Sequence, residues 1–162
     1  MNLYILRHAD ADKRDEEKFP DDNTRKLVKK GKNKTEKIAK FLKKRKVKVS
    51  LILSVPALRS LEATKLIRKE LDLAKEQLVQ LDCLLPGASN AELIAEIKEK
   101  YTVDSLLVVG HDPNLSLLIS QLVTGTPDLP IDLKKGGLCK LAVDELVDGK
   151  CATLELLLTP NF

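Results

Sequence analysis

The chain contains only two histidines, and each follows an apolar run typical of a buried strand. The run over residues 2–6 leads into Arg7-His8, and the run over residues 105–110 ends just before His111. In open sheets of parallel strands, ligands bind beyond the carboxyl ends of the strands. We therefore expect both imidazoles to lie at a sheet edge where a ligand can bind.

Histidine and arginine at such an edge suggest phosphoryl-transfer chemistry. An imidazole can attack a phosphoryl group and carry it covalently, which makes His8 the candidate nucleophile. The charged phosphoryl oxygens need fixed donors, and a guanidinium group can bind two oxygens at once. Arg7, together with Arg59 after a third apolar run, would form this clamp, with His111 as a further donor. Asp112 is a candidate substrate contact and a candidate acid for the leaving group.

Several of these residues also have an ordinary structural interpretation. Arg59 could pair with Glu62, three residues along the same helix. Asp112 precedes a proline at an expected helix start, where aspartate is a common cap. Ser54 is a candidate phosphate donor, but its hydroxyl could instead cap the helix that is expected to start near Pro56.

Helical patterns separate the apolar runs. Apolar or small residues recur every three or four positions from Leu27 to Leu42, which predicts a helix with Thr24 as its cap. We expect further helices over 58–71, over 90–100 with Asn90 as the cap, and over 114–123. Strands are expected at 2–6, 49–54, 78–81, 105–110, 138–143 and 152–158, the last two joined by a turn at Asp148-Gly149. This alternation favours a single α/β domain over residues 1–162 with a mainly parallel sheet.

The charges of the chain are unevenly distributed. The net charge of the 162 residues is +4, yet residues 25–48 contain 13 basic residues and one acidic residue, Glu36. This lysine-rich segment could bind nucleic acid, but Phe41 is its only aromatic residue, so it offers no platform for stacking bases. A nucleic-acid-binding module therefore stands as the alternative of a different class.

Composition also predicts the compartment. The three cysteines, Cys83, Cys139 and Cys151, are scattered, without the spacing of a zinc site, and we interpret them as small buried residues in a reducing compartment. No run of 18 apolar residues occurs, so we expect a cytoplasmic protein that does not enter a membrane. We also expect a monomer.

Three ordered motifs resemble those of the histidine phosphatase superfamily. They are Leu6-Arg-His-Ala-Asp10, Ser54-x-Pro-x-x-Arg59 with Glu62-Ala-Thr, and Gly110-His111-x-Pro113-x-Leu115-Ser116. Leu85-Pro-Gly87 also fits, so the resemblance covers nearly the whole chain. It is strongest to the small SixA-type phosphohistidine phosphatases.

The resemblance implies a three-layer α/β/α fold like that of phosphoglycerate mutase and a hydrolase without metal or other cofactor. It makes His8 the phosphorylated nucleophile and places Arg7, Arg59 and His111 in the phosphate pocket. Arg25, in Arg25-Lys-Leu27, matches an arginine that approaches the pocket in SixA-type members.

Two departures from the family pattern bear on mechanism. Ala9 replaces the commoner glycine, and the glutamate that serves larger mutases as general acid has no counterpart, so the identity of the acid stays open.

The resemblance also implies a partner. The expected substrate is a phosphorylated protein that carries phosphohistidine, and the alternative is a small phosphoester cleaved by a broad-specificity phosphomonoesterase.

Asp10-Ala-Asp12 is similar to the nucleophile of magnesium-dependent aspartyl phosphatases, but Arg14 stands where those enzymes have a small hydroxyl residue.

Overall fold

The apolar segments pair into one six-stranded sheet in the computed structural model, which describes residues 1–162. The strands are β1 (Asn2–Arg7), β2 (Leu51–Ser54), β3 (Leu78–Gln80), β4 (Ser105–Gly110), β5 (Leu138–Val143) and β6 (Ala152–Leu158), in the order β3-β2-β4-β1-β5-β6. The first four strands pair in parallel, whereas β5 and β6 are antiparallel to their neighbours. The predicted mainly parallel sheet is confirmed, and Asp148-Gly149 lies in the connection between β5 and β6.

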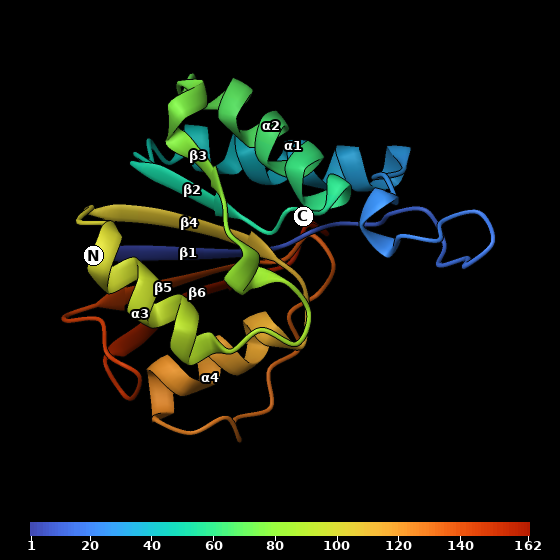
Figure 1. The fold of residues 1–162 in the computed structure, drawn as a ribbon. Coiled ribbons are helices and arrows are strands. Elements are labelled where there is room, and N and C mark those ends of the chain that lie inside the picture. The colour runs from blue at the N-terminus through green and yellow to red at the C-terminus, as the bar shows by residue number, and fades with distance from the viewer.

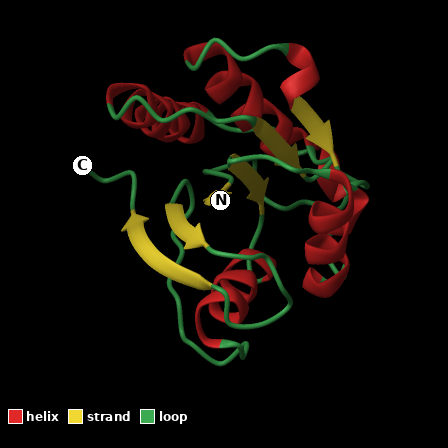
Figure 2. Cartoon of the chain, turned by 90° about the vertical axis from the view of Figure 1, so that its left-hand side faces the viewer, coloured by secondary structure: helices red, strands yellow, loops and turns green.

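Helices cover both faces of this sheet. Successive β4 residues point to opposite faces, so Leu106 and Val108 join one core while Leu107 and Val109 join the other. Both faces of β4 are buried, which explains its uninterrupted apolar sequence. The helices are α1 (Lys29–Lys44) and α2 (Leu58–Glu70) on one face, and α3 (Asn90–Lys100) and α4 (Asn114–Thr124) on the other (Figures 1 and 2). The expected three-layer α/β/α arrangement is confirmed.

The pairing of β1 with β4 positions the two histidines. Arg7 is in register with Gly110, and the amide of His8 donates to the Gly110 carbonyl at 3.0 Å. His8 and His111 therefore leave neighbouring strands at the same edge. On the other side of β4, β2 ends at Ser54 and leads into α2.

Two predicted helix caps are wrong. Thr24 ends a short 3₁₀ turn, η1 (Asp22–Thr24), and α1 begins only after Val28, which has no capping side chain. The cap of α3 is Ser89 rather than Asn90, because the Ser89 hydroxyl accepts the amide of Ala91 at 3.1 Å. The second error arises because either of two neighbouring polar residues can cap a helix, whereas the first arises because α1 starts without any capping side chain.

The cysteines are unpaired. Cys139 is buried as expected, whereas Cys83 and Cys151 are only half-buried. Burial raises the pKa of the Cys83 and Cys139 thiols to about 12, which keeps both protonated at neutral pH. None of the helices combines the length and the apolar character needed to cross a bilayer.

Candidate active site

A cavity of about 690 Å³ lies at the carboxyl ends of β1 and β4. It brings together six of the seven predicted site residues, namely Arg7, His8, Arg25, Arg59, His111 and Asp112. The other lining residues are Ala11, Asp12, Lys13, Arg14, Asp22, Pro86, Gly87, Pro113, Asn114 and Lys135. With six basic and three acidic side chains, and with neutral histidines, the lining carries a net charge of +3. This charge suits an anionic ligand.

The imidazole of His8 is held as one tautomer. Its Nδ1 lies 2.8 Å from the carbonyl oxygen of Ala9, and because a carbonyl can only accept, Nδ1 carries the proton. Burial, with further contributions from the charges of Arg59 and Arg7, lowers the pKa of His8 from 6.5 to about 4. At neutral pH the ring is therefore uncharged, with the lone pair on Nε2 as its nucleophilic position.

Arg59 reaches this lone pair from the first turn of α2. Its Nε donates to His8 Nε2 at 3.3 Å, while Nη1 and Nη2 donate to the carbonyl oxygen of Asp22 at 2.9 Å and to its carboxylate at 3.3 Å. The Arg59 side chain is only 5% exposed. The alternative pairing with Glu62 does not occur. The Glu62 carboxylate instead accepts the amide of Leu27 at 3.2 Å and lies 3.9 Å from Nζ of Lys32.

Arg7 and His111 retain unused hydrogen-bonding capacity beside His8. Nη1 of Arg7 donates to the Leu133 carbonyl at 2.8 Å, but its buried Nε has no partner, and neither does the buried Nε2 of His111. Burial, reinforced by the charge of Arg59, lowers the pKa of His111, so this ring is also uncharged at neutral pH.

The structure does not bring Ser54 to the cavity. Its side chain is fully buried, and the hydroxyl donates to the Val55 carbonyl at 2.9 Å, so it neither reaches the cavity nor caps α2. Asp112 does line the cavity. Its two oxygens, however, accept the amide and the hydroxyl of Ser116 at 3.1 and 2.7 Å, as in the capping interpretation.

Sequence reasoning missed Asp22. Its carboxylate accepts Nε and Nη2 of Arg25 at 2.7 and 3.2 Å, in addition to the contact with Arg59. The hydrogen bonds from Arg25, and the charges of Arg25 and Arg59, lower the pKa of Asp22, so the carboxylate is ionised at neutral pH. The only sequence signal for this role is the Asp-x-x-Arg spacing, which places both side chains on one side of a 3₁₀ turn.

Other cationic residues at the cavity, which sequence reasoning also missed, are Lys13, Arg14 and Lys135. All three are exposed and come from two loops whose meeting depends on the fold. No group of three or more histidine, cysteine, aspartate or glutamate side chains is arranged to hold a metal ion.

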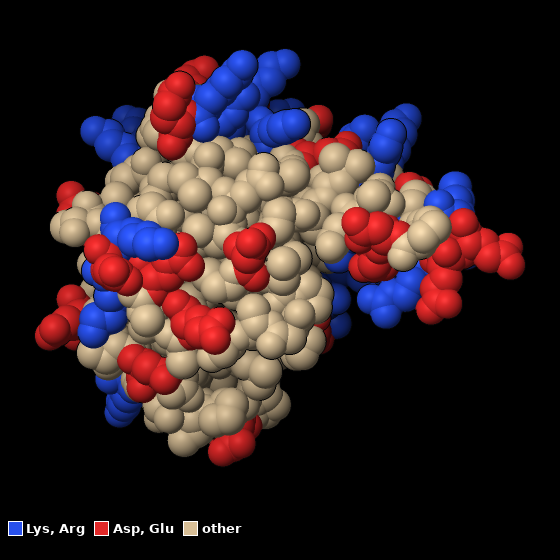
Figure 3. All heavy atoms as spheres, viewed as in Figure 1, with Lys and Arg blue, Asp and Glu red and all other residues tan.

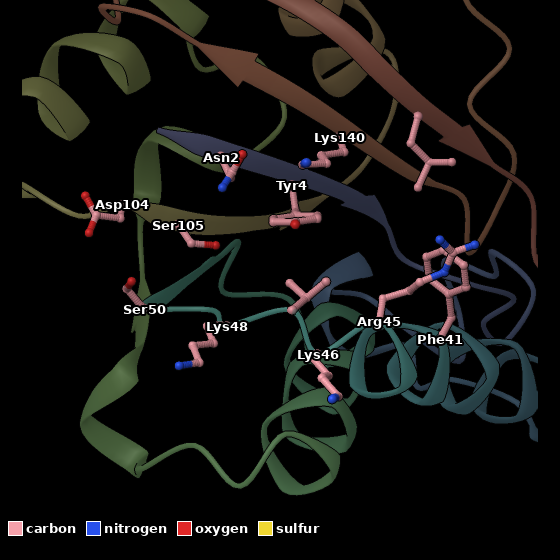
Figure 4. A pocket seen from close by; sticks show the side chains of 12 residues that line it. Asn2, Tyr4, Phe41, Arg45, Lys46, Lys48, Ser50, Asp104, Ser105 and Lys140 are labelled. Carbon is pink, nitrogen blue, oxygen red and sulfur yellow. The ribbon is translucent and has the colours of Figure 1, made fainter.

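A second cavity, of about 660 Å³, lies at the opposite edge of the sheet, where β1 and β4 begin. It contains none of the predicted site residues. Figure 4 shows that the side chains of Lys46 and Lys48 point away from the space between Tyr4 and Ser105. Two of its four cationic side chains therefore do not point into that space.

Comparison with solved structures finds similar chains over nearly the full length. A protein histidine phosphatase SixA complexed with tungstate is 27% identical, with a TM-score of 0.80, and the match covers 99% of this chain and 97% of that one. The SixA protein of Agrobacterium tumefaciens is 25% identical, with a TM-score of 0.78 and coverage of 99% and 98%. The alpha-ribazole phosphatase of Shigella flexneri, at 15% identity, a TM-score of 0.72 and coverage of 99% and 97%, shares the fold.

No protein-family model matches the chain, and neither does any curated protein sequence. The structural matches nevertheless confirm the resemblance that the three motifs indicate. The chain has the fold of the histidine phosphatase superfamily, and its similarity to SixA phosphohistidine phosphatases supports a phosphatase of this type.

Proposed function

We propose that the protein removes a phosphoryl group through a phosphohistidine intermediate on His8. The observation that carries the proposal is the contact of Arg59 with the unprotonated Nε2 of His8, in a cavity that Arg7 and His111 also line. Guanidinium and imidazole groups around this nitrogen supply donors for the phosphoryl oxygens, whose charge they would offset without a metal ion.

The reaction has two steps. His8 Nε2 attacks phosphorus in line with the leaving group, the bond to the leaving group breaks, and that group takes up a proton. Water then attacks the phosphohistidine, the phosphorus–Nε2 bond breaks, and inorganic phosphate leaves with His8 restored. In the first step, the Nε of Arg59 transfers its hydrogen bond from the imidazole to a phosphoryl oxygen, which frees the lone pair for attack.

The proposed substrate is a phosphohistidine on a protein partner. Only one of the 16 residues around the cavity, Ala11, is hydrophobic, whereas pockets for small organic molecules have mostly apolar walls. The ionised carboxylate of Asp22 and the engaged carboxylate of Asp112 are poorly suited to donate a proton. A phosphorylated imidazole suits such a site, because its second nitrogen can hold the proton that the departing ring needs.

Trapping the intermediate tests this proposal. Brief exposure to a small phosphoramidate, an alkaline quench and peptide mapping should locate the phosphoryl group on His8. The His8→Ala variant should lose both the label and turnover while its thermal unfolding stays close to that of the original protein. Full turnover by this variant would exclude the mechanism. A label that is lost in the alkaline quench, but that maps to Asp10 or Asp12 after a parallel mildly acidic quench, would instead support an aspartyl phosphatase.

Substrate comparison separates the two kinds of phosphatase. A peptide carrying phosphohistidine should be hydrolysed with a higher kcat/KM than sugar phosphates or nucleotides. The reverse order would favour the broad-specificity phosphomonoesterase.

A further inference from the structure

Two arginines of the cavity meet on a single carboxylate. Arg59 extends from α2 and Arg25 follows the turn η1, so they belong to separate parts of the chain. Both donate hydrogen bonds to the Asp22 carboxylate. Arg25 donates to both carboxylate oxygens, and Arg59 donates to Oδ2 only. A third arginine, Arg14, lies 3.6 Å from the same group.

Without this carboxylate, the guanidinium groups would repel one another in a confined space. Burial, together with the charge of Arg25, lowers the pKa of Arg59, while the negative charge of Asp22 acts in the opposite direction. Since the Arg59 side chain is only 5% exposed, water can screen this repulsion only weakly. Asp22 therefore stabilises the close approach of the two cations.

The geometry of Arg59 shows which part of the guanidinium group Asp22 restrains. The carbonyl oxygen and the carboxylate of Asp22 accept hydrogen bonds from Nη1 and Nη2, at the far end of the guanidinium group. Nε is left to face His8. The contacts from Asp22 thus fix the orientation of the edge that points at the nucleophile without covering that edge.

We propose that Asp22 is a positioning residue that assembles Arg25 and Arg59 into one oxyanion clamp before substrate arrives. This inference rests on the proposed function. Asp22 acts through the two arginines and need not touch the substrate. Its effect is expected on the affinity for phosphoryl oxygens more than on the stability of the fold, because the side chain is 40% exposed on a short turn.

The neighbouring carboxylate provides a matched control. Asp21 belongs to the same turn, but its side chain accepts only the amide of Asn23 and contacts no arginine. Asp21→Asn and Asp22→Asn therefore make the same change of charge and nearly the same change of shape on adjacent residues. Thermal unfolding of both variants reports any loss of folded protein.

The test is tungstate binding measured by calorimetry, together with KM and kcat for a small phosphoramidate. Asp22→Asn should weaken tungstate binding and raise KM by about tenfold or more, with a smaller change in kcat, whereas Asp21→Asn should change neither. Unchanged tungstate affinity in Asp22→Asn would overturn the assignment. Tighter binding would also overturn it, because the carboxylate would then be a competitor of the oxyanion.

Tungstate binding requires the clamp but no turnover. If the original protein binds tungstate but hydrolyses no phosphoramidate, the proposed function fails, while the comparison of the two variants still decides the role of Asp22. If both variants bind tungstate like the original protein while hydrolysis proceeds through His8, the role of Asp22 fails and the proposed function stands.

Discussion

The protonation state of His8 determines the pH range over which the proposed reaction can run. Burial, and the positive charges of Arg59 and Arg7, disfavour the protonated ring and lower its pKa to about 4. A solvent-exposed histidine would be largely protonated, and so unable to attack, at pH 5. The same side chain in this cavity is uncharged there.

At the residue scale, we therefore predict that the loss of activity in acid occurs at a lower pH than it would with an ordinary histidine. Plotted against pH and corrected for ionisation of the substrate, kcat/KM should stay level from pH 7 to pH 5 and fall only near pH 4. A fall centred near pH 6.5 would show that the ring titrates like a free histidine. The Asp21→Asn variant, whose substitution lies outside the cavity lining, should lose activity over the same pH range as the original protein.

Stability has a matching dependence on pH. The unfolded chain binds a proton at His8 near pH 6.5, whereas the folded protein binds it only near pH 4. The unfolded state therefore holds more protons between these values, and the contribution of His8 to stability is complete above about pH 6.5 and is lost as the pH falls toward 4.

At the scale of elements, α1 packs directly against the segment that follows His8, the proposed nucleophile. A Cβ atom added to Gly31 would lie 2.1 Å from the carbonyl oxygen of Asp10, two residues after His8. The same carbonyl accepts the amide of Val28 at 3.0 Å, just before the helix begins. The missing side chain at Gly31 is therefore what permits this close contact.

Replacing Gly31 with alanine should lower the melting temperature and the activity together. Alanine is the better helix former by about 1 kcal/mol, but it would force backbone atoms apart, at a cost of about 1–3 kcal/mol or more. Differential scanning calorimetry and turnover measure the two effects. Gly149→Ala is the control, because nothing lies within 4 Å of an added Cβ there. Equal melting temperatures for the two variants would contradict the argument.

The elements and the residues next to strand ends were predictable from the sequence because their signals are local. Arg7 is the last residue of β1 and His8 follows it, so the apolar run alone placed them. Ser54 also ends a strand, but its side chain points into the buried interior, a direction that the continuous apolar pattern of β2 does not reveal. Asp22 lies in a long loop whose path depends on contacts with α2, and the sequence has no periodicity that reports them.

At the scale of the whole molecule, the lysine-rich segment forms an exposed surface separate from the cavity. Figure 3 shows Lys and Arg side chains gathered over α1 and α2, while many acidic side chains lie on the part of the face below them. Lys29, Lys40 and Lys44 are exposed and have no acidic partner within 4.0 Å. Of residues 25–48, only Arg25 lines the cavity.

Neutralising these three lysines with glutamine should slow the association of an acidic phosphohistidine peptide at low salt and leave kcat unchanged. Stopped-flow binding at low and high salt measures the effect, which should vanish at high salt because ions screen the surface charges. Glutamine at Lys75, Lys98 and Lys150, three exposed lysines outside the segment, is the control. A change in kcat, or an equal effect at high salt, would contradict a steering role.

The hydrogen bond between His8 Nδ1 and the Ala9 carbonyl determines which ring nitrogen can be phosphorylated. A histidine ring can be phosphorylated on either nitrogen, and the two products are distinct isomers with different chemical lifetimes. Because Nδ1 is occupied as a donor, the proposed intermediate is the Nε2 isomer alone. The backbone of Ala9 would thereby set the regiochemistry of the proposed reaction.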